Sequence, residues 1–125
     1  MNKLKLGRQE FDNLVERALD QLPDVFARYL EEVPVVIEDI PTPAICRRVG
    51  LKKGHYLLGI FMGVPLKHRH TFADTGPNQI ILYRQNLLAA ATNREELAEQ
   101  IRCTVVHELG HYVGFTEDQL RQAGY

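Results

Sequence analysis

The fold of this chain can be interpreted outward from five residues, His107-Glu108-Leu109-Gly110-His111, which read H-E-x-x-H. Histidines four residues apart lie on one face of an α-helix, about one turn from each other, so both imidazoles can reach a single metal ion. The residue after the first histidine points roughly 100° around the helix, at the edge of that face. A carboxylate at this position can contact a metal-bound water without being a ligand itself. The pattern therefore predicts a helical zinc site in which Glu108 is the general base.

The residues around the motif predict a long helix that carries it. Thr92 or Asn93 is a suitable N-cap, and acidic residues follow in the first turn. The helix is expected to run from about Arg94 to Val113 and to end at Gly114 in a left-handed turn. A broad apolar arc runs along it, formed by Leu97, Ile101, Thr104, Val105, Leu109 and Tyr112. Such a helix is expected to be central and buried, and so to hold its histidines rigidly.

A catalytic zinc ion usually has three protein ligands and one water, so a third ligand has to be found. Gly114 lets the backbone reverse direction, after which Glu117 or Asp118 can return towards the metal. The spacing favours Glu117, and Asp118 is the second choice. Both carboxylates would also suit the first turn of a final short helix, where they need no metal. The remaining alternatives are a second water, His68, His70 and Asp74.

Helical and strand patterns elsewhere predict a small α+β domain spanning residues 1–125. Apolar residues recur at helical spacing over residues 7–22, and a further turn or two of helix is expected at residues 24–30. Three runs rich in apolar or β-branched residues predict short strands at Val33–Glu38, Leu57–Met62 and Gln79–Arg84. Pro34 cannot donate a ladder hydrogen bond, so it is expected at a strand start or on an edge.

Composition and charge exclude several classes of protein. The formal net charge is −1 in 125 residues, which disfavours nucleic acid and membrane surfaces as partners. No segment has the length and apolarity of a membrane span, and the charged first twenty residues do not predict a secretory signal. The two cysteines form no disulfide framework, so a cytoplasmic, reducing location is the simplest expectation. Residues 44–56 are basic and are interpreted as a solvated loop, with a substrate-gathering patch as the alternative.

Cys103 precedes the first histidine of the motif by one helical turn, but it is not expected to bind the metal. Positions 103, 107 and 111 span about 12 Å of helix axis, too far for one ion with bonds near 2 Å. We interpret Cys103 as a small buried residue.

Four segments of the sequence carry a resemblance to a known family: Phe11–Val15, Leu58–Leu66, Ile80–Arg84 and Thr104–Leu120. On these segments the chain resembles the small bacterial zincin-like metallopeptidases, or minimal zincins. The resemblance implies a short mixed sheet packed on an N-terminal helix and a central active-site helix. It also implies one zinc ion held by His107, His111 and an acidic residue after Gly114. The family pattern has aspartate where this chain has Glu117, and no methionine follows the motif as it does in metzincins.

The function expected from the sequence is that of a zinc metallopeptidase, in which Glu108 activates a zinc-bound water for peptide hydrolysis. A peptide or protein would be the substrate, and a monomer is the default oligomeric state. The strand Gln79–Arg84 is expected beside the active-site helix, where it could pair with an extended peptide, and Tyr83 or Arg84 could stabilise the oxyanion. The alternatives are a zinc-containing binding or regulatory module without catalysis and, against the charge, a hydrolase acting on nucleic acid.

Overall fold

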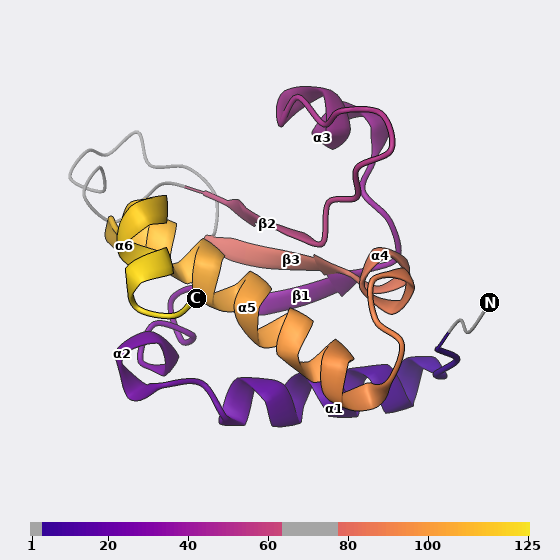
Figure 1. The fold of residues 1–125 in the computed structure, drawn as a ribbon, viewed down its shortest axis with the longest axis horizontal. Coiled ribbons are helices and arrows are strands. Elements are labelled where there is room, and N and C mark those ends of the chain that lie inside the picture. Colours follow the sequence, from indigo (N-terminus) through magenta and orange to yellow (C-terminus); the bar gives the residue numbers. More distant parts are fainter. Residues whose placement is uncertain (1–3, 64–77) are drawn as a thin grey trace.

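The computed structural model describes residues 4–63 and 78–125, which form a small three-stranded sheet with helices around it (Figure 1). Six helices and three strands follow one another along the described chain. In order they are α1 (Arg8–Asp20), α2 (Asp24–Ala27), β1 (Val35–Glu38), α3 (Pro43–Arg48), β2 (Gly59–Met62), β3 (Gln79–Tyr83), α4 (Arg84–Ala89), α5 (Arg94–Val113) and α6 (Glu117–Gln122). The α+β fold expected from the sequence is therefore confirmed.

The sheet has the strand order β1-β3-β2, so β3 is its central strand. β1 runs parallel to β3, with Val35 opposite Ile80, whereas β2 runs antiparallel, with Phe61 opposite Ile80. The expectation that Gln79–Arg84 could pair with a peptide as an edge strand is wrong, because both of its edges are already paired. Pro34 lies just before the edge strand β1, where its carbonyl accepts a hydrogen bond from Ile80 N–H (3.0 Å), as expected of a proline.

Helix α5 lies between the sheet and α1, and its buried side chains form the centre of the core (Figure 1). Asn93 caps its start by accepting a hydrogen bond from Glu96 N–H (2.8 Å), and Gly114 ends it at φ 105°. Both ends match the sequence prediction. The apolar side chains that α5 contributes to the core are Leu97, Ile101, Val105, Val106, Leu109 and Tyr112. The helix that carries the H-E-x-x-H motif is therefore fixed along most of its length.

Helix α3 was not expected, because residues 44–56 were interpreted as a loop. Its start is set by Thr42, whose side chain accepts a hydrogen bond from Ile45 N–H (3.2 Å), and by Pro43 in the first turn. Proline in this position costs no helix hydrogen bond. None of the α3 side chains is buried, so the helix lacks the apolar stripe by which a helix is recognised in a sequence.

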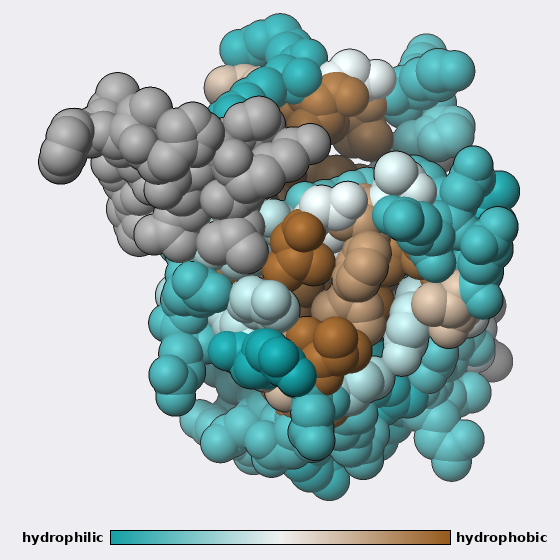
Figure 2. Space-filling view, turned by 90° about the vertical axis from the view of Figure 1, so that its left-hand side faces the viewer, coloured by the Kyte–Doolittle hydropathy of each residue, from teal (hydrophilic) through white to brown (hydrophobic). Residues whose placement is uncertain are grey.

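Hydrophobic side chains gather in the middle of the face at the α6 end of the molecule, bordered by hydrophilic ones (Figure 2). The exposed apolar side chains of α2 and of the turn after α5 are Val25 (48%) and Phe115 (38%). They line an apolar cavity of about 300 Å³ against α6. No helix in residues 4–63 or 78–125 combines the length and apolarity needed to cross a membrane.

Candidate metal centre

The two histidines of the motif share a single carboxylate partner, Glu117. His107 Nε2 lies 3.2 Å from one carboxylate oxygen of Glu117, and His111 Nε2 lies 2.8 Å from the other. The two imidazole rings have their centroids 6.3 Å apart and are partly open to solvent, with 34% and 41% of their side-chain surface exposed. The structure therefore brings together the two histidines and the acidic residue that the spacing favoured.

Glu117 reaches the histidines because the chain reverses tightly after α5. Phe115 N–H donates to the Gly110 carbonyl (2.8 Å) and Gly114 N–H to the His111 carbonyl (3.2 Å), the hydrogen-bond pair of a Schellman motif. Gly114 has φ 105°, a left-handed conformation in which a side chain would be strained. Thr116 then caps α6 by accepting a hydrogen bond from Gln119 N–H (3.1 Å). The turn and cap set Glu117 as the first residue of α6, facing back towards α5.

Close packing of α6 on α5 depends on the second glycine of this region, Gly110. A Cβ atom at Gly110 would lie only 2.6 Å from a terminal methyl group of Leu120, which is almost completely buried. Glycine thus allows α6 to approach α5 more closely than any other residue would permit. The approach places Glu117, one turn before Leu120, within reach of both imidazoles.

Glu108 makes a contact that the sequence did not reveal. Its Oε1 accepts a hydrogen bond from the backbone N–H of Phe61 in β2 (2.8 Å). Burial raises the pKa of the Glu108 carboxyl, while the Phe61 N–H and the neighbouring histidines oppose that rise. Glu117 behaves in the opposite way: the hydrogen bond with His111 holds its pKa below the usual range. The two carboxylates of the site therefore differ in their tendency to take up a proton.

The pairing of β2 with β3 explains why the Phe61 N–H group can donate to Glu108. Tyr83 N–H donates to the Leu58 carbonyl (3.0 Å), so in this antiparallel pair the polar groups of even-numbered β2 residues face β3. Those of Gly59 and Phe61 face the outer edge. Gly59 also lets α5 come close, since a Cβ atom there would lie 2.7 Å from a methyl group of Thr104. Glu108, one turn along α5 from Thr104, then reaches the strand edge.

The donor set suits zinc, although the ligands are not arranged around a metal in this structure. Two imidazoles and one carboxylate are a common catalytic zinc set, and tetrahedral bonds near 2.1 Å put ligand atoms about 3.4 Å apart. The observed contacts of 2.8 and 3.2 Å are slightly shorter, because Glu117 is hydrogen-bonded directly to both rings. Within residues 4–63 and 78–125, no three His, Cys, Asp or Glu side chains surround a common point in metal-binding geometry. To bind a zinc ion between them, the two rings and Glu117 would have to move apart by a few tenths of an ångström.

Asp118 and Cys103 lie away from this centre. Asp118 is 84% exposed and faces Arg121 within α6, with 3.8 Å between Oδ1 and Nη2. Cys103 Sγ contacts Glu99 Oε1 at 3.5 Å, and burial raises the pKa of its thiol. Of the two acidic candidates, the structure brings only Glu117 to the histidines. The other three candidates, His68, His70 and Asp74, lie outside the described residues.

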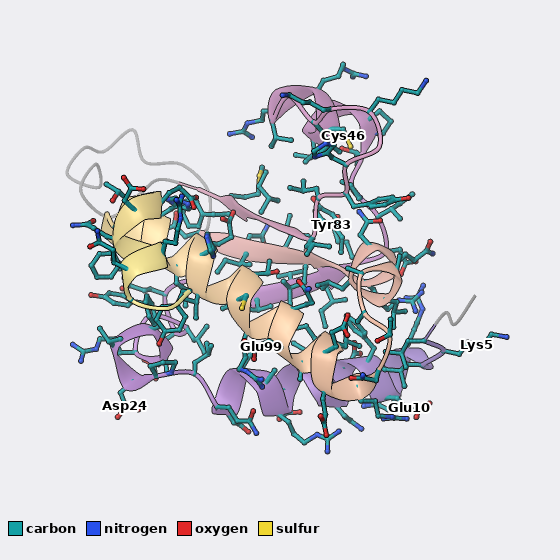
Figure 3. The ribbon with its side chains drawn as sticks, viewed as in Figure 1. Lys5, Glu10, Asp24, Cys46, Tyr83 and Glu99 are labelled. Atoms are coloured by element: carbon teal, nitrogen blue, oxygen red, sulfur yellow. The ribbon has the colours of Figure 1, made fainter. Side chains whose placement is uncertain are left out.

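The structure does not bring Tyr83 and Arg84, the candidates for stabilising the oxyanion, to the two histidines. Arg84 Nε is paired with Asp39 Oδ1 at 3.0 Å. Tyr83 is buried at the end of β3, three residues beyond Ile80, which is the strand partner of Phe61. Three residues of strand span about 10 Å, and Figure 3 shows Tyr83 below α3, away from the α6 end of the molecule.

Comparison with known proteins identifies the family and the fold. The model of the zincin-like metallopeptidase family matches residues 30–125, and the chain belongs to this family. Among solved structures, a conserved hypothetical protein from T. thermophilus has the same fold, with a TM-score of 0.57 and 22% sequence identity. The match covers 94% of this chain and 99% of that one. No curated protein matches the sequence. The expected zincin-like family is thus confirmed, and zinc binding is typical of it.

Proposed function

We propose that this protein is a zinc-dependent peptidase whose metal ligands are His107, His111 and Glu117 and whose general base is Glu108. One observation carries the proposal: a single carboxylate contacts both motif histidines at 2.8 and 3.2 Å, while the second carboxylate is held beside them by a backbone N–H. Packing of the core does not account for these groups, since three of the four side chains are partly open to solvent. A peptide or protein is the proposed substrate, and a monomer is the proposed state.

The chemistry divides between the metal and the protein side chains. When bound, zinc supplies Lewis acidity, which lowers the pKa of a water ligand to about 7 and polarises a carbonyl group. Glu108 accepts a proton from the attacking water and later passes it to the leaving amine. Phe61 N–H occupies Oε1 of Glu108, so Oε2 is the oxygen left for proton transfer. Burial raises the pKa of Glu108 towards the range in which a carboxyl both accepts and releases a proton.

The outer edge of β2 replaces β3 as the proposed place for an extended peptide. β2 pairs with β3 on one side, and the polar groups of Gly59 and the carbonyl of Phe61 face outward on the other. A peptide that adds to this edge would form main-chain hydrogen bonds there. Its scissile bond would then pass Glu108, which meets the same edge at Phe61.

The substitution Glu108→Gln tests this function. The amide cannot accept the proton, so hydrolysis of a peptide library should fall by a factor of about 10² to 10⁴. Zinc affinity, measured by calorimetry, should stay near that of the unsubstituted protein, because Glu108 is not a proposed ligand. Glu95→Gln, in the exposed first turn of the same helix, is the matched control and should change neither quantity.

Two results would contradict the proposal. Unchanged hydrolysis by Glu108→Gln would remove Glu108 from the mechanism. Tight zinc binding without cleavage of any library peptide by the unsubstituted protein would instead select the second candidate, a zinc-containing binding module. The partial exposure of both histidines favours catalysis over that candidate, because a purely structural zinc site has no need for an open position.

A further inference from the structure

The segment of residues 43–57 is an exposed basic arm, and we use that name for it below. It contains α3 and the turns that follow, and none of its side chains is buried. Its charged side chains are all positive and all exposed: Arg47, Arg48, Lys52 and Lys53. No Asp or Glu occurs between residues 40 and 73, and none of the four cations pairs with a carboxylate of residues 4–63 or 78–125. Since the whole chain has a net charge of −1, the rest of the molecule carries −5.

The basic arm leads directly into β2 and also folds back over it. Figure 1 shows α3 beyond β2, away from α1. Arg48 Nη1 lies 3.8 Å from the sulfur of Met62, the residue after Phe61. Successive side chains of a strand point to opposite faces, and Phe61 contacts Tyr112 of α5 with 5.4 Å between ring centroids. Met62 therefore faces the arm, and the outer edge of β2 lies between Glu108 on one face and Arg48 on the other.

We propose that the basic arm recognises acidic side chains of the peptide substrate on the side of β2 opposite the metal centre. This inference rests on the proposed function. A peptide extended along the β2 edge would point alternate side chains to the two faces of the sheet. Those on the α5 face meet the metal centre, and those on the other face meet the arm. Because Arg48 contacts Met62, the residue after Phe61, the arm acts close to the scissile bond.

An acidic peptide fits this surface better than a nucleic acid does. A polyanion that extended beyond the arm would meet a body with a net charge of −5, which repels it. A short peptide with two or three carboxylates needs only the four cations of the arm. Its uncharged parts can still form main-chain hydrogen bonds with the strand edge.

Peptide binding without turnover tests the proposal. The zinc-loaded Glu108→Gln protein would be titrated against labelled decapeptides that differ only in carrying Glu, Gln or Lys at alternate positions around the centre. We expect the Glu peptide to bind most tightly and its affinity to fall with rising salt. Arg48→Gln should weaken binding of the Glu peptide about two- to fivefold, and Lys52→Gln with Lys53→Gln should add to the loss. The Gln peptide should respond to neither change.

Arg17→Gln is the matched control, because Arg17 is an exposed arginine of α1, the helix on the far side of α5. Equal affinity for the Glu and Gln peptides, or an equal loss in Arg17→Gln and Arg48→Gln, would overturn the proposal. So would tighter, arm-dependent binding of single-stranded DNA than of the Glu peptide. If acidic peptides bind through the arm but the unsubstituted protein cleaves none, the inference stands and only the proposed peptidase activity fails.

Discussion

At the scale of single residues, the site depends on which partner each carboxylate has. Glu117 lies between two imidazoles, and hydrogen bonding to them lowers its pKa, which favours the anionic form that its proposed role as a metal ligand requires. Glu108 is buried, which raises its pKa, and the Phe61 N–H offsets part of that rise. Two glutamates of similar intrinsic acidity are thereby given different roles by what surrounds them.

The hydrogen bond to Glu108 can be removed without changing Glu108 itself. Phe61→Pro deletes the N–H group at a place where the backbone faces the outer edge, so the pairing with β3 is kept. Glu108 should then have a higher pKa, and because the base must be ionised, the acid limb of the pH–rate profile should move to higher pH. The rate constant kcat for peptide cleavage should fall at least about tenfold, as expected for a lost hydrogen bond to a charged group.

Phe61→Ala is the control for this prediction, because it keeps the N–H group and loses only the ring that contacts Tyr112. Zinc affinity should be similar in both variants. If the proline and alanine variants have the same kcat and the same acid limb, the hydrogen bond has no part in positioning Glu108.

The local part of this site could be predicted from the sequence, and the long-range part could not. His107, His111 and Glu117 lie within ten residues of one another, so helix periodicity and a glycine turn are enough to bring them together. The Phe61 contact joins residues 47 apart and uses a backbone group, which no side-chain pattern reveals. The same limit applies to Arg84, whose pairing with Asp39 depends on how β1 and β3 align.

At the scale of elements, the close contact of α6 with α5 determines whether Glu117 reaches the two motif histidines. Alanine normally stabilises a helix interior by about 1 kcal/mol relative to glycine. At Gly110 we expect the reverse, because the new methyl group would lie 2.6 and 2.9 Å from the two terminal methyl groups of Leu120. Overpacking of this kind costs about 1–3 kcal/mol.

Gly110→Ala should therefore lower the melting temperature and, by displacing α6, weaken zinc binding measured by calorimetry. The double-mutant cycle with Leu120→Ala provides the control, since a smaller Leu120 side chain leaves room for the methyl group. Gly110→Ala should cost less in the Leu120→Ala background than in the unsubstituted protein. Equal costs in both backgrounds would show that Leu120 does not limit the approach of α6.

The helices that bury a long apolar face, α1 and α5, were predicted from the sequence. The first and last residues of α5 were predicted correctly because Asn93 and Gly114 are strong signals for helix ends and the apolar arc between them is long. Helix α3 was missed because it buries nothing, although Thr42 and Pro43 form a start signal. The strands were recognised, but their order was not, since the central position of β3 follows from pairings that a single strand sequence does not encode.

At the scale of the whole molecule, the hydrophobic core and the proposed metal centre are largely separate. The core brings together α1, α2, α5, α6 and the sheet through a continuous set of buried apolar side chains. The proposed ligands come only from the end of α5 and the start of α6, and they are partly exposed. The fold should therefore persist without metal, unlike that of small zinc fingers, which unfold when the metal is removed.

Removal of zinc with a chelator should consequently leave the far-ultraviolet circular dichroism spectrum unchanged while lowering the melting temperature. A ligand present at 100 times its Kd stabilises a native state by about 2.7 kcal/mol, which for a domain of this size corresponds to roughly 10 °C. His107→Ala should melt near the temperature of the chelated protein and should not respond to added zinc. His55→Ala, which removes an exposed histidine of the basic arm, should retain the full zinc-dependent shift. Loss of secondary structure on chelation would instead mean that the metal, and not the apolar core, holds α5 and α6 in place.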